Sequence, residues 1–89
     1  MRFKYNMQFQ KVGDNYIGVA VGKDKEFFTE YLVLNETGYE IAVKMNNDIS
    51  KEQLTDQMLE SYDEDQAVME ECIDDIINYL KKHNVIWTE

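Results

Sequence analysis

The chain has 89 residues, of which 44% are apolar and eleven are aromatic, enough for one small folded domain rather than a disordered segment. No stretch approaches the roughly 20 apolar residues of a membrane span, and the start MRFKYNMQFQ lacks the apolar core of a signal peptide, so a cytoplasmic protein is expected. The formal charge of −9 opposes the nonspecific attraction to phosphate on which nucleic-acid binding depends.

Three short strands are predicted in the first third of the chain. Apolar and polar residues alternate in 7–12 and in 16–21, and residues 13–15 between them are Gly-Asp-Asn, which favour a turn. A second turn is predicted at 22–25, and the aromatic and β-branched segment FFTEYLVL (27–34) is predicted as the third strand. Short connections between consecutive strands predict an antiparallel meander.

Three helices are predicted after the strands, and each has a recognisable start. Asn35 can cap the first, Ser50 opens the second with a capping box (SKEQ), and the third begins after Asp63 or Asp65 and runs to about residue 82. Their predicted inward positions, at helical spacing, are Gly38, Ile41, Ala42 and Met45; Leu54, Met58 and Leu59 or Tyr62; and Met69, Ile73, Ile76 and Leu80.

The order of three strands and three helices predicts a single α+β domain over residues 1–89, with a three-stranded antiparallel sheet packed on the helices. The apolar segment 85–87 is expected to fold back on the core.

The residues that carry chemistry give no support for an enzyme. Cys72 is the only cysteine and falls on an apolar side of its helix, where an inert thiol is usual, and the lone His83 suits a helix C-terminus. No cofactor or zinc site is expected from so few ligands. The sequon at Asn35 is better explained as a helix cap, since no secretion signal precedes it. The acidic run 63–75 has no glycine for a calcium loop, which leaves a solvated face or a docking face for a basic partner.

Two features suggest recognition of another molecule. The predicted third strand would lie at a sheet edge with Glu30 as its only charge, and such an edge can accept a peptide strand. The third helix carries a second stripe beside its core stripe, so either the rest of the domain covers that side or it is free for a ligand. The members of the second stripe are Val68, Cys72, Asp75 and Tyr79.

In their order and spacing, four motifs resemble those of the coenzyme PQQ synthesis protein D (PqqD) family, over about residues 27 to 87. The family has a strand ending in Leu-Asn before a first helix, a Glu-Gln-Leu helix that continues to Leu-x-x-x-Tyr, and a third helix ending in spaced Leu and Ile. Asn-Asn-Asp follows the first helix here, where the family often has Asp-Gly. The matching residues are Leu34-Asn35, Glu52-Gln53-Leu54, Leu59-Glu60-Ser61-Tyr62, in which Leu and Tyr are one residue closer than in the family pattern, and Leu80 to Ile86.

The resemblance implies a winged-helix-like fold and a noncatalytic peptide-recognition domain, also called a RiPP recognition element. Such a domain binds the leader of a ribosomally made precursor peptide as an added strand and presents it to a modifying enzyme, often a radical SAM enzyme. The acidic residues of the third helix suggest a leader with basic residues. Carried onto this sequence, the expected peptide-binding residues are Phe28, Thr29, Glu30, Tyr31, Leu32 and Val33 of the strand, and Val68, Cys72, Asp75 and Tyr79 of the helix.

Two other functions stay open at this point. The helical trio is compatible with a winged-helix DNA-binding regulator, although the negative charge and the absence of a basic recognition helix disfavour it. A noncatalytic interaction subunit of a larger enzyme fits the sequence as well as a peptide adaptor does.

Overall fold

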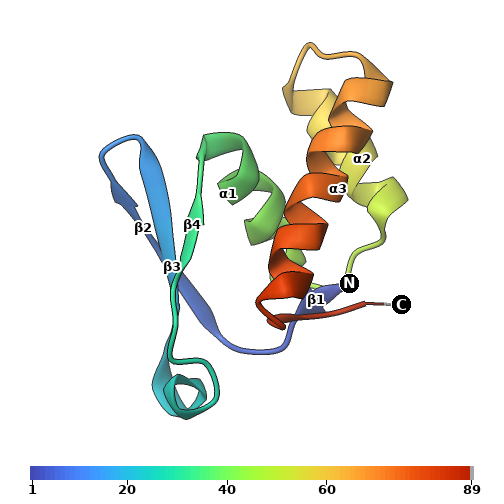
Figure 1. Cartoon of the computed structure of the whole chain (residues 1–89). Helices are drawn as coiled ribbons and strands as arrows, with labels where there is room; N and C mark the ends of the chain where they lie inside the picture. The colour runs from blue at the N-terminus through green and yellow to red at the C-terminus, as the bar shows by residue number, and fades with distance from the viewer. Residues whose placement is uncertain (89) are drawn as a thin grey trace.

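The structure, a computed structural model, describes residues 1–88. Within them, a three-stranded sheet stands beside three α-helices, and a short two-stranded sheet lies next to the C-terminal end of the third helix (Figure 1). The three-stranded sheet comprises β2 (Met7–Val12), β3 (Asn15–Ala20) and β4 (Leu32–Leu34); the helices are α1 (Glu36–Val43), α2 (Lys51–Ser61) and α3 (Gln66–Lys82); β1 (Arg2–Phe3) pairs with β5 (Ile86–Trp87); and η1 (Gly22–Glu26) and η2 (Lys44–Asn46) are 3₁₀ helices.

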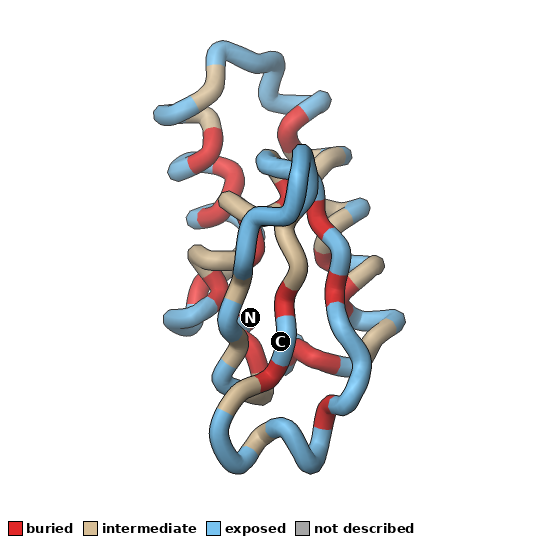
Figure 2. The backbone as a smooth tube through the Cα atoms, turned by 90° about the vertical axis from the view of Figure 1, so that its left-hand side faces the viewer, coloured by how far each residue is buried: buried red, intermediate tan, exposed pale blue. Residues whose placement is uncertain are grey.

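The α+β architecture predicted from the sequence is confirmed. The sheet order is β2-β3-β4, with both pairs antiparallel, and three helices follow it along the chain. Gly13 has a φ of +63° at the turn between β2 and β3, a conformation that favours glycine. The inner face of the sheet packs toward the helices, whereas no helix within residues 1–88 covers its outer face (Figure 2).

The predicted third strand, 27–34, is wrong in length, since only Leu32–Leu34 is a strand. The chain instead forms η1 and leaves it through Phe27 and Phe28, whose amides both donate to the carbonyl of Asp24, at 3.0 and 3.2 Å. The Phe28 side chain is buried and its ring stacks on Tyr5, at 6.3 Å between ring centroids. These contacts hold residues 27–28 in a turn, so the β propensity of FFTEYLVL is overridden by local hydrogen bonds and packing.

The predicted caps of the first two helices are confirmed. Asn35 Oδ1 accepts a hydrogen bond from the Gly38 amide at 2.8 Å. Ser50 and Gln53 form both bonds of a capping box, at 3.1 and 3.0 Å. Asp65 is the N-cap of α3, but its side chain makes no capping hydrogen bond. The starts of α1 and α2 therefore follow from local sequence, whereas α3 depends more on packing.

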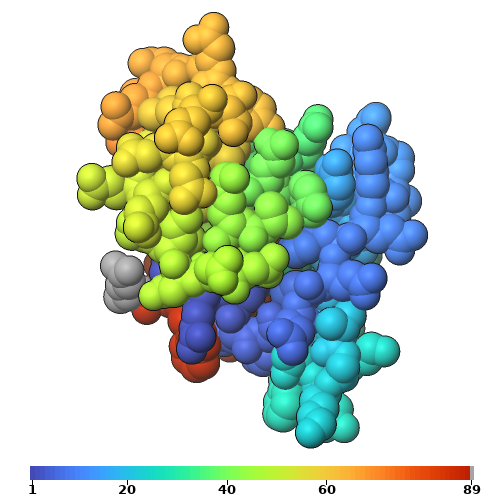
Figure 3. Space-filling model, turned by 180° about the vertical axis from the view of Figure 1, so that it is seen from behind, coloured from blue at the N-terminus to red at the C-terminus, as the bar shows by residue number. Residues whose placement is uncertain are grey.

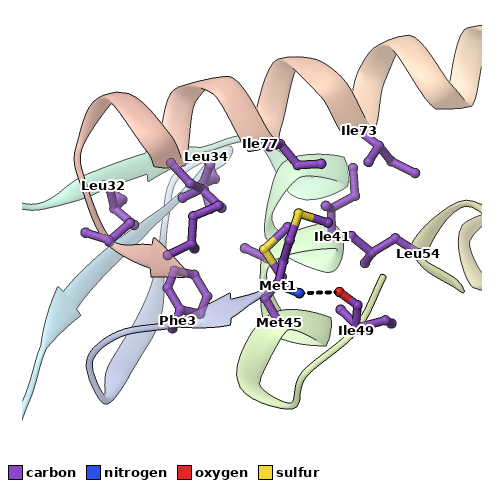
Figure 4. Packing of buried hydrophobic residues seen from close by; sticks show 14 of the residues in the cluster. Met1, Phe3, Leu32, Leu34, Ile41, Met45, Ile49, Leu54, Ile73 and Ile77 are labelled. Carbon is purple, nitrogen blue, oxygen red and sulfur yellow. Dashed lines mark hydrogen bonds between the residues drawn. The ribbon is translucent and has the colours of Figure 1, made fainter. Parts of the chain in front are cut away.

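The inward positions are confirmed with one exception, in α3. Ile77 is buried there and Ile76, which was predicted to be, is only half-buried. Spacings of 4, 3, 4 and of 4, 4, 3 both match the helical period, so the sequence pattern allows either isoleucine. Ile73 and Ile77 point from α3 toward Ile41 in the core (Figure 4). Leu59 and Tyr62, which were alternatives for α2, are both half-buried against the core.

The two ends of the described chain meet in the small β1–β5 sheet, where Arg2 pairs with Trp87. Val85 and Ile86 are buried, which confirms that this segment folds back, but Trp87 is 54% exposed and lies under the Lys4 ammonium group, 4.6 Å from the ring centroid. The N-terminal ammonium group donates to the Ile49 carbonyl at 2.7 Å (Figure 4). Sequence patterning predicted no strand at residues 2–3.

The face opposite to that of Figure 1 is a continuous surface of α1 and α2 side chains beside the strands, with η1 projecting below them (Figure 3). No helix among residues 1–88 is long and apolar enough to cross a membrane.

Candidate functional site

β4 is one of the two edge strands of the three-stranded sheet, and the one beside α3. Its register with β3 pairs Tyr16 with Leu34, Ile17 with Val33 and Gly18 with Leu32. The Val33 amide donates to the hydroxyl of Tyr79 on α3, so it faces away from β3. Because the backbone groups of an antiparallel strand alternate between two sides, Leu32 and Leu34 pair with β3 and Val33 presents its amide and carbonyl at the edge.

The side chains of β4 divide between the core and the surface. Leu32 and Leu34 are buried, whereas Val33 is 42% exposed on the outer face of the sheet. Glu30 and Tyr31 are exposed just before the strand, and Tyr31 is 62% exposed. The strand is therefore anchored by alternate leucines, and its edge and the segment preceding it remain accessible.

The six predicted strand residues are consequently not equivalent. Thr29, Glu30, Tyr31 and Val33 are exposed, but Phe28 and Leu32 are core residues whose side chains are not available to a ligand. Phe28 also lies in the turn that ends η1, outside the sheet.

A shallow hollow lies where β4 runs alongside α3. Its lining residues, which define what we call the β4–α3 groove, are Asn15, Val33, Leu34, Asn35, Ile76 and Tyr79.

Of the groove residues, Val33 and Tyr79 were predicted as site residues, whereas Asn15, Leu34, Asn35 and Ile76 were not. Ile76 had been assigned to the core. Its neighbours on the same side of the helix are Cys72, four residues before it, and Tyr79, three residues after it. The apolar stripe beside the core stripe is therefore Val68, Cys72, Ile76 and Tyr79, whose spacings of 4, 4 and 3 match the helical period as well as those of the predicted stripe do. Asp75 flanks this stripe and is exposed.

The structure does not bring all predicted helix residues to the strand. Tyr79 contacts Val33, and His83, one turn further along α3, lies beside Glu30. The strand and the helix therefore run in opposite directions. Val68 is eleven residues before Tyr79, roughly 16 Å along the helix axis. Val68 and Cys72 thus lie beyond the point where β4 ends, and only a ligand that continued past Leu34 would reach them.

Val68 and Cys72 are nevertheless accessible positions. Val68 is 43% exposed, and the Cys72 thiol is free and half-buried. The predicted second stripe is therefore only partly covered by the rest of the domain, and its N-terminal part continues from the β4–α3 groove as an apolar surface.

Two polar contacts join β4 and the segment before it to α3 and its C-cap residue. The Val33 amide donates to Tyr79 Oη at 2.9 Å, and His83 Nδ1 lies 3.6 Å from Glu30 Oε2. The rings of Tyr79 and His83 meet edge to face, with centroids 4.7 Å apart. Of these residues, His83 was predicted only as a helix C-terminal residue, which it is, at the C-cap of α3.

The side chains of α3 carry a net negative charge, and its acidic residues differ in whether a cationic side chain lies beside them. Asp74 forms an ion pair with Lys51 of α2 at 2.7 Å, and this hydrogen bond raises the pKa of Lys51. Glu71 and Asp75 are exposed on the same helix. An acidic third helix is poorly suited to enter a DNA groove, because like charges repel the phosphate backbone. No group of three or more metal-binding side chains occurs within residues 1–88.

An antiparallel sheet with an open edge strand, followed by three helices of which the last lines that edge, defines a winged-helix-like α+β domain. The chain belongs to the coenzyme PQQ synthesis protein D (PqqD) family, whose sequence model matches residues 18–86.

The fold is also shared with a solved structure, described as TbiB1 in complex with the TbiA(beta) leader peptide. The two chains align over 100% of each, with a TM-score of 0.73 and 14% sequence identity. None of the curated protein sequences matches this chain.

Proposed function

We propose that this protein is a noncatalytic adaptor that binds the leader of a ribosomally made precursor peptide and presents it to a modifying enzyme. The observation that carries this proposal is the edge of β4, which turns the Val33 backbone toward the β4–α3 groove beside an apolar stripe. An extended peptide can add to such an edge by main-chain hydrogen bonds, and pockets beside it then select side chains. Membership of the PqqD family and the leader complex of the structural neighbour support this function.

The bound peptide would run along β4 and continue along α3. Its backbone would pair with Val33 and, by the same two-residue alternation, with Tyr31. Past Val33, about five further extended residues would cover the roughly 16 Å to the level of Val68. Side chains on the helix side of the peptide would pack on Ile76, Cys72 and Val68, so we expect a leader with apolar residues at alternate positions.

The exposed carboxylates of Glu71 and Asp75 flank this path. They favour a leader with basic residues next to its apolar ones, since opposite charges raise association rates and select partners. Because both carboxylates are exposed, this preference should weaken as the salt concentration rises.

The partner enzyme in this proposal is a peptide-modifying enzyme, for example a radical SAM enzyme, and the adaptor itself needs no cofactor. Its proposed location is the cytoplasm, where ribosomally made peptides are accessible to such enzymes.

The test is a backbone scan of a synthetic leader from a precursor peptide encoded beside this gene. Replacing peptide N–H groups one at a time by N-methyl groups removes single main-chain donors. Strand addition predicts that affinity, measured by calorimetry, falls at alternate positions and is little changed between them. Amide-shift changes should concentrate in residues 29–34 and on the groove side of α3.

Two results would contradict the proposal. One is no detectable binding at high micromolar leader concentration. The other is binding whose shifts are confined to α1 and α2, with no alternation in the N-methyl scan. A leader of the same composition in scrambled order serves as the control for nonspecific attraction.

A further inference from the structure

One backbone amide at the edge of β4 already has a hydrogen-bond partner within the protein. Val33 is the residue whose amide faces away from β3, and that amide donates to Tyr79 Oη at 2.9 Å. An added peptide strand would need the same amide, because its carbonyl must accept a hydrogen bond from it. One donor cannot form a full hydrogen bond with both acceptors, so the Tyr79 hydroxyl and a peptide carbonyl compete for one group.

A second contact lies beside the groove, one helical turn further along. Glu30, in the segment before β4, reaches His83 at the end of α3, with 3.6 Å between the carboxylate and imidazole atoms. The His83 ring also packs edge to face on Tyr79. Tyr79 of α3 and His83 at its C-cap, four residues apart, thus contact β4 and the segment before it at two points.

We infer that Tyr79 is a gate on the β4 edge, and that the described conformation is its closed state. This inference rests on the proposed function and adds a regulation of the same site. A peptide strand opens the gate when its carbonyl replaces the tyrosine hydroxyl on Val33. The Tyr79 ring remains in the groove wall, where it contacts the peptide's side chains.

The gate has a consequence for selectivity. Any strand that adds to β4 loses the net value of the Val33–Tyr79 hydrogen bond, which lowers its affinity by about threefold to tenfold. A peptide that also packs on Ile76 and the remaining stripe regains this loss through burial of apolar surface. A strand that pairs only through its backbone does not regain this loss of affinity. The Val33–Tyr79 hydrogen bond therefore disfavours nonspecific pairing of strands with the β4 edge.

The test compares two variants that each remove one tyrosine hydroxyl. Tyr79→Phe removes the acceptor on Val33 and keeps the ring. Tyr62→Phe is the matched control, because the Tyr62 hydroxyl donates to Glu40 of α1, away from β4. Circular dichroism checks that both variants keep the fold.

In the peptide-free protein, amide exchange measured by NMR should be threefold to tenfold faster at Val33 in Tyr79→Phe. Leu32 and Leu34, whose amides pair with β3, should be unchanged. Calorimetry with the synthetic leader should show threefold to tenfold tighter binding to Tyr79→Phe than to the native protein, and unchanged binding to Tyr62→Phe.

The outcomes separate this inference from the function beneath it. If the native protein binds the leader and Tyr79→Phe binds it equally or more weakly, the gate is refuted and the adaptor function stands. An unchanged Val33 exchange rate also refutes the gate. If none of the three proteins binds the leader, the adaptor function fails and the gate fails with it, whatever the exchange rates show.

Discussion

Two adjacent isoleucines of α3 offer a direct test of which side of this helix faces the core. Ile77 is buried and 9% exposed, whereas Ile76 is half-buried and lines the β4–α3 groove. We consider the pair of variants Ile77→Ala and Ile76→Ala. Both place alanine in the interior of the same helix, so the gain in helix propensity is the same and cancels in the comparison.

Because the two side chains are buried to different extents, the two substitutions should lower the free energy of unfolding by different amounts. Deleting a buried isoleucine side chain to its Cβ leaves a cavity and typically costs about 2–4 kcal/mol. The free energy of unfolding expected for a chain of this length is roughly 4–13 kcal/mol, so this cost is a large fraction of it. Ile77→Ala should therefore lower the Tm by about 10–25 °C. Ile76→Ala removes a side chain that is only partly covered and should cost about 1 kcal/mol, or about 4–8 °C.

The assay is urea unfolding followed by circular dichroism, with thermal unfolding as a second measurement. Leader affinity provides an independent comparison at a temperature where both variants are folded. Ile76→Ala should bind the leader more weakly than the native protein, and Ile77→Ala should bind it with unchanged affinity. If Ile76→Ala costs as much stability as Ile77→Ala, or more, the assignment of these two residues to groove and core is wrong.

Two further variants test the strand–helix junction and the charge of the groove. Asn35→Ala removes the cap on the Gly38 amide and should lower the free energy of unfolding by about 1 kcal/mol and the Tm by about 4–8 °C. Asn35→Ser keeps a capping oxygen and should retain most of the native stability and Tm. Equal Tm values for all three proteins would show that the cap contributes nothing. Asp75→Lys should weaken binding of a basic leader by about twofold to fivefold at low salt and by less at 0.5 M salt. Glu60→Lys on α2, where the native residue is also exposed, is the control and should leave the affinity unchanged. Identical affinities of both variants would argue that Glu71 and Asp75 do not select the leader.

Local sequence was sufficient wherever the structure is determined by near neighbours. The β2–β3 hairpin requires only alternating residues and a turn with Gly13, and both were present. Asn35 and Ser50 mark helix starts because each side chain bonds to an amide three residues ahead. The order of these elements, the edge strand and the second stripe of the third helix were also predicted from the residues, and the family resemblance added the winged-helix-like fold and a peptide as the expected ligand.

The predictions were wrong where contacts between residues far apart in the sequence select one of several structures that the local sequence favours equally. FFTEYLVL has the composition of a strand throughout, but Phe28 is held in a turn by Asp24 and stacks on Tyr5. The strand β1 has two residues and pairs with residues 86–87, so no local pattern marks it. The two isoleucines at 76 and 77 fit the helical period equally well, and only the packing of α3 against α1 selects Ile77 for the core.

The sequence by itself determined the class of fold, the starts of the first two helices, and the presence of an edge strand and a second stripe on the third helix, because periodicity and capping are short-range properties. That the strand and the stripe lie together was implied by the family resemblance. Tertiary structure decided how those two elements meet. It shortened the strand to Leu32–Leu34, set it antiparallel to α3, and thereby placed the Tyr79 hydroxyl on the Val33 amide. A hydrogen bond between residues 46 positions apart has no local signature, since it exists only once the sheet and the helix have packed together.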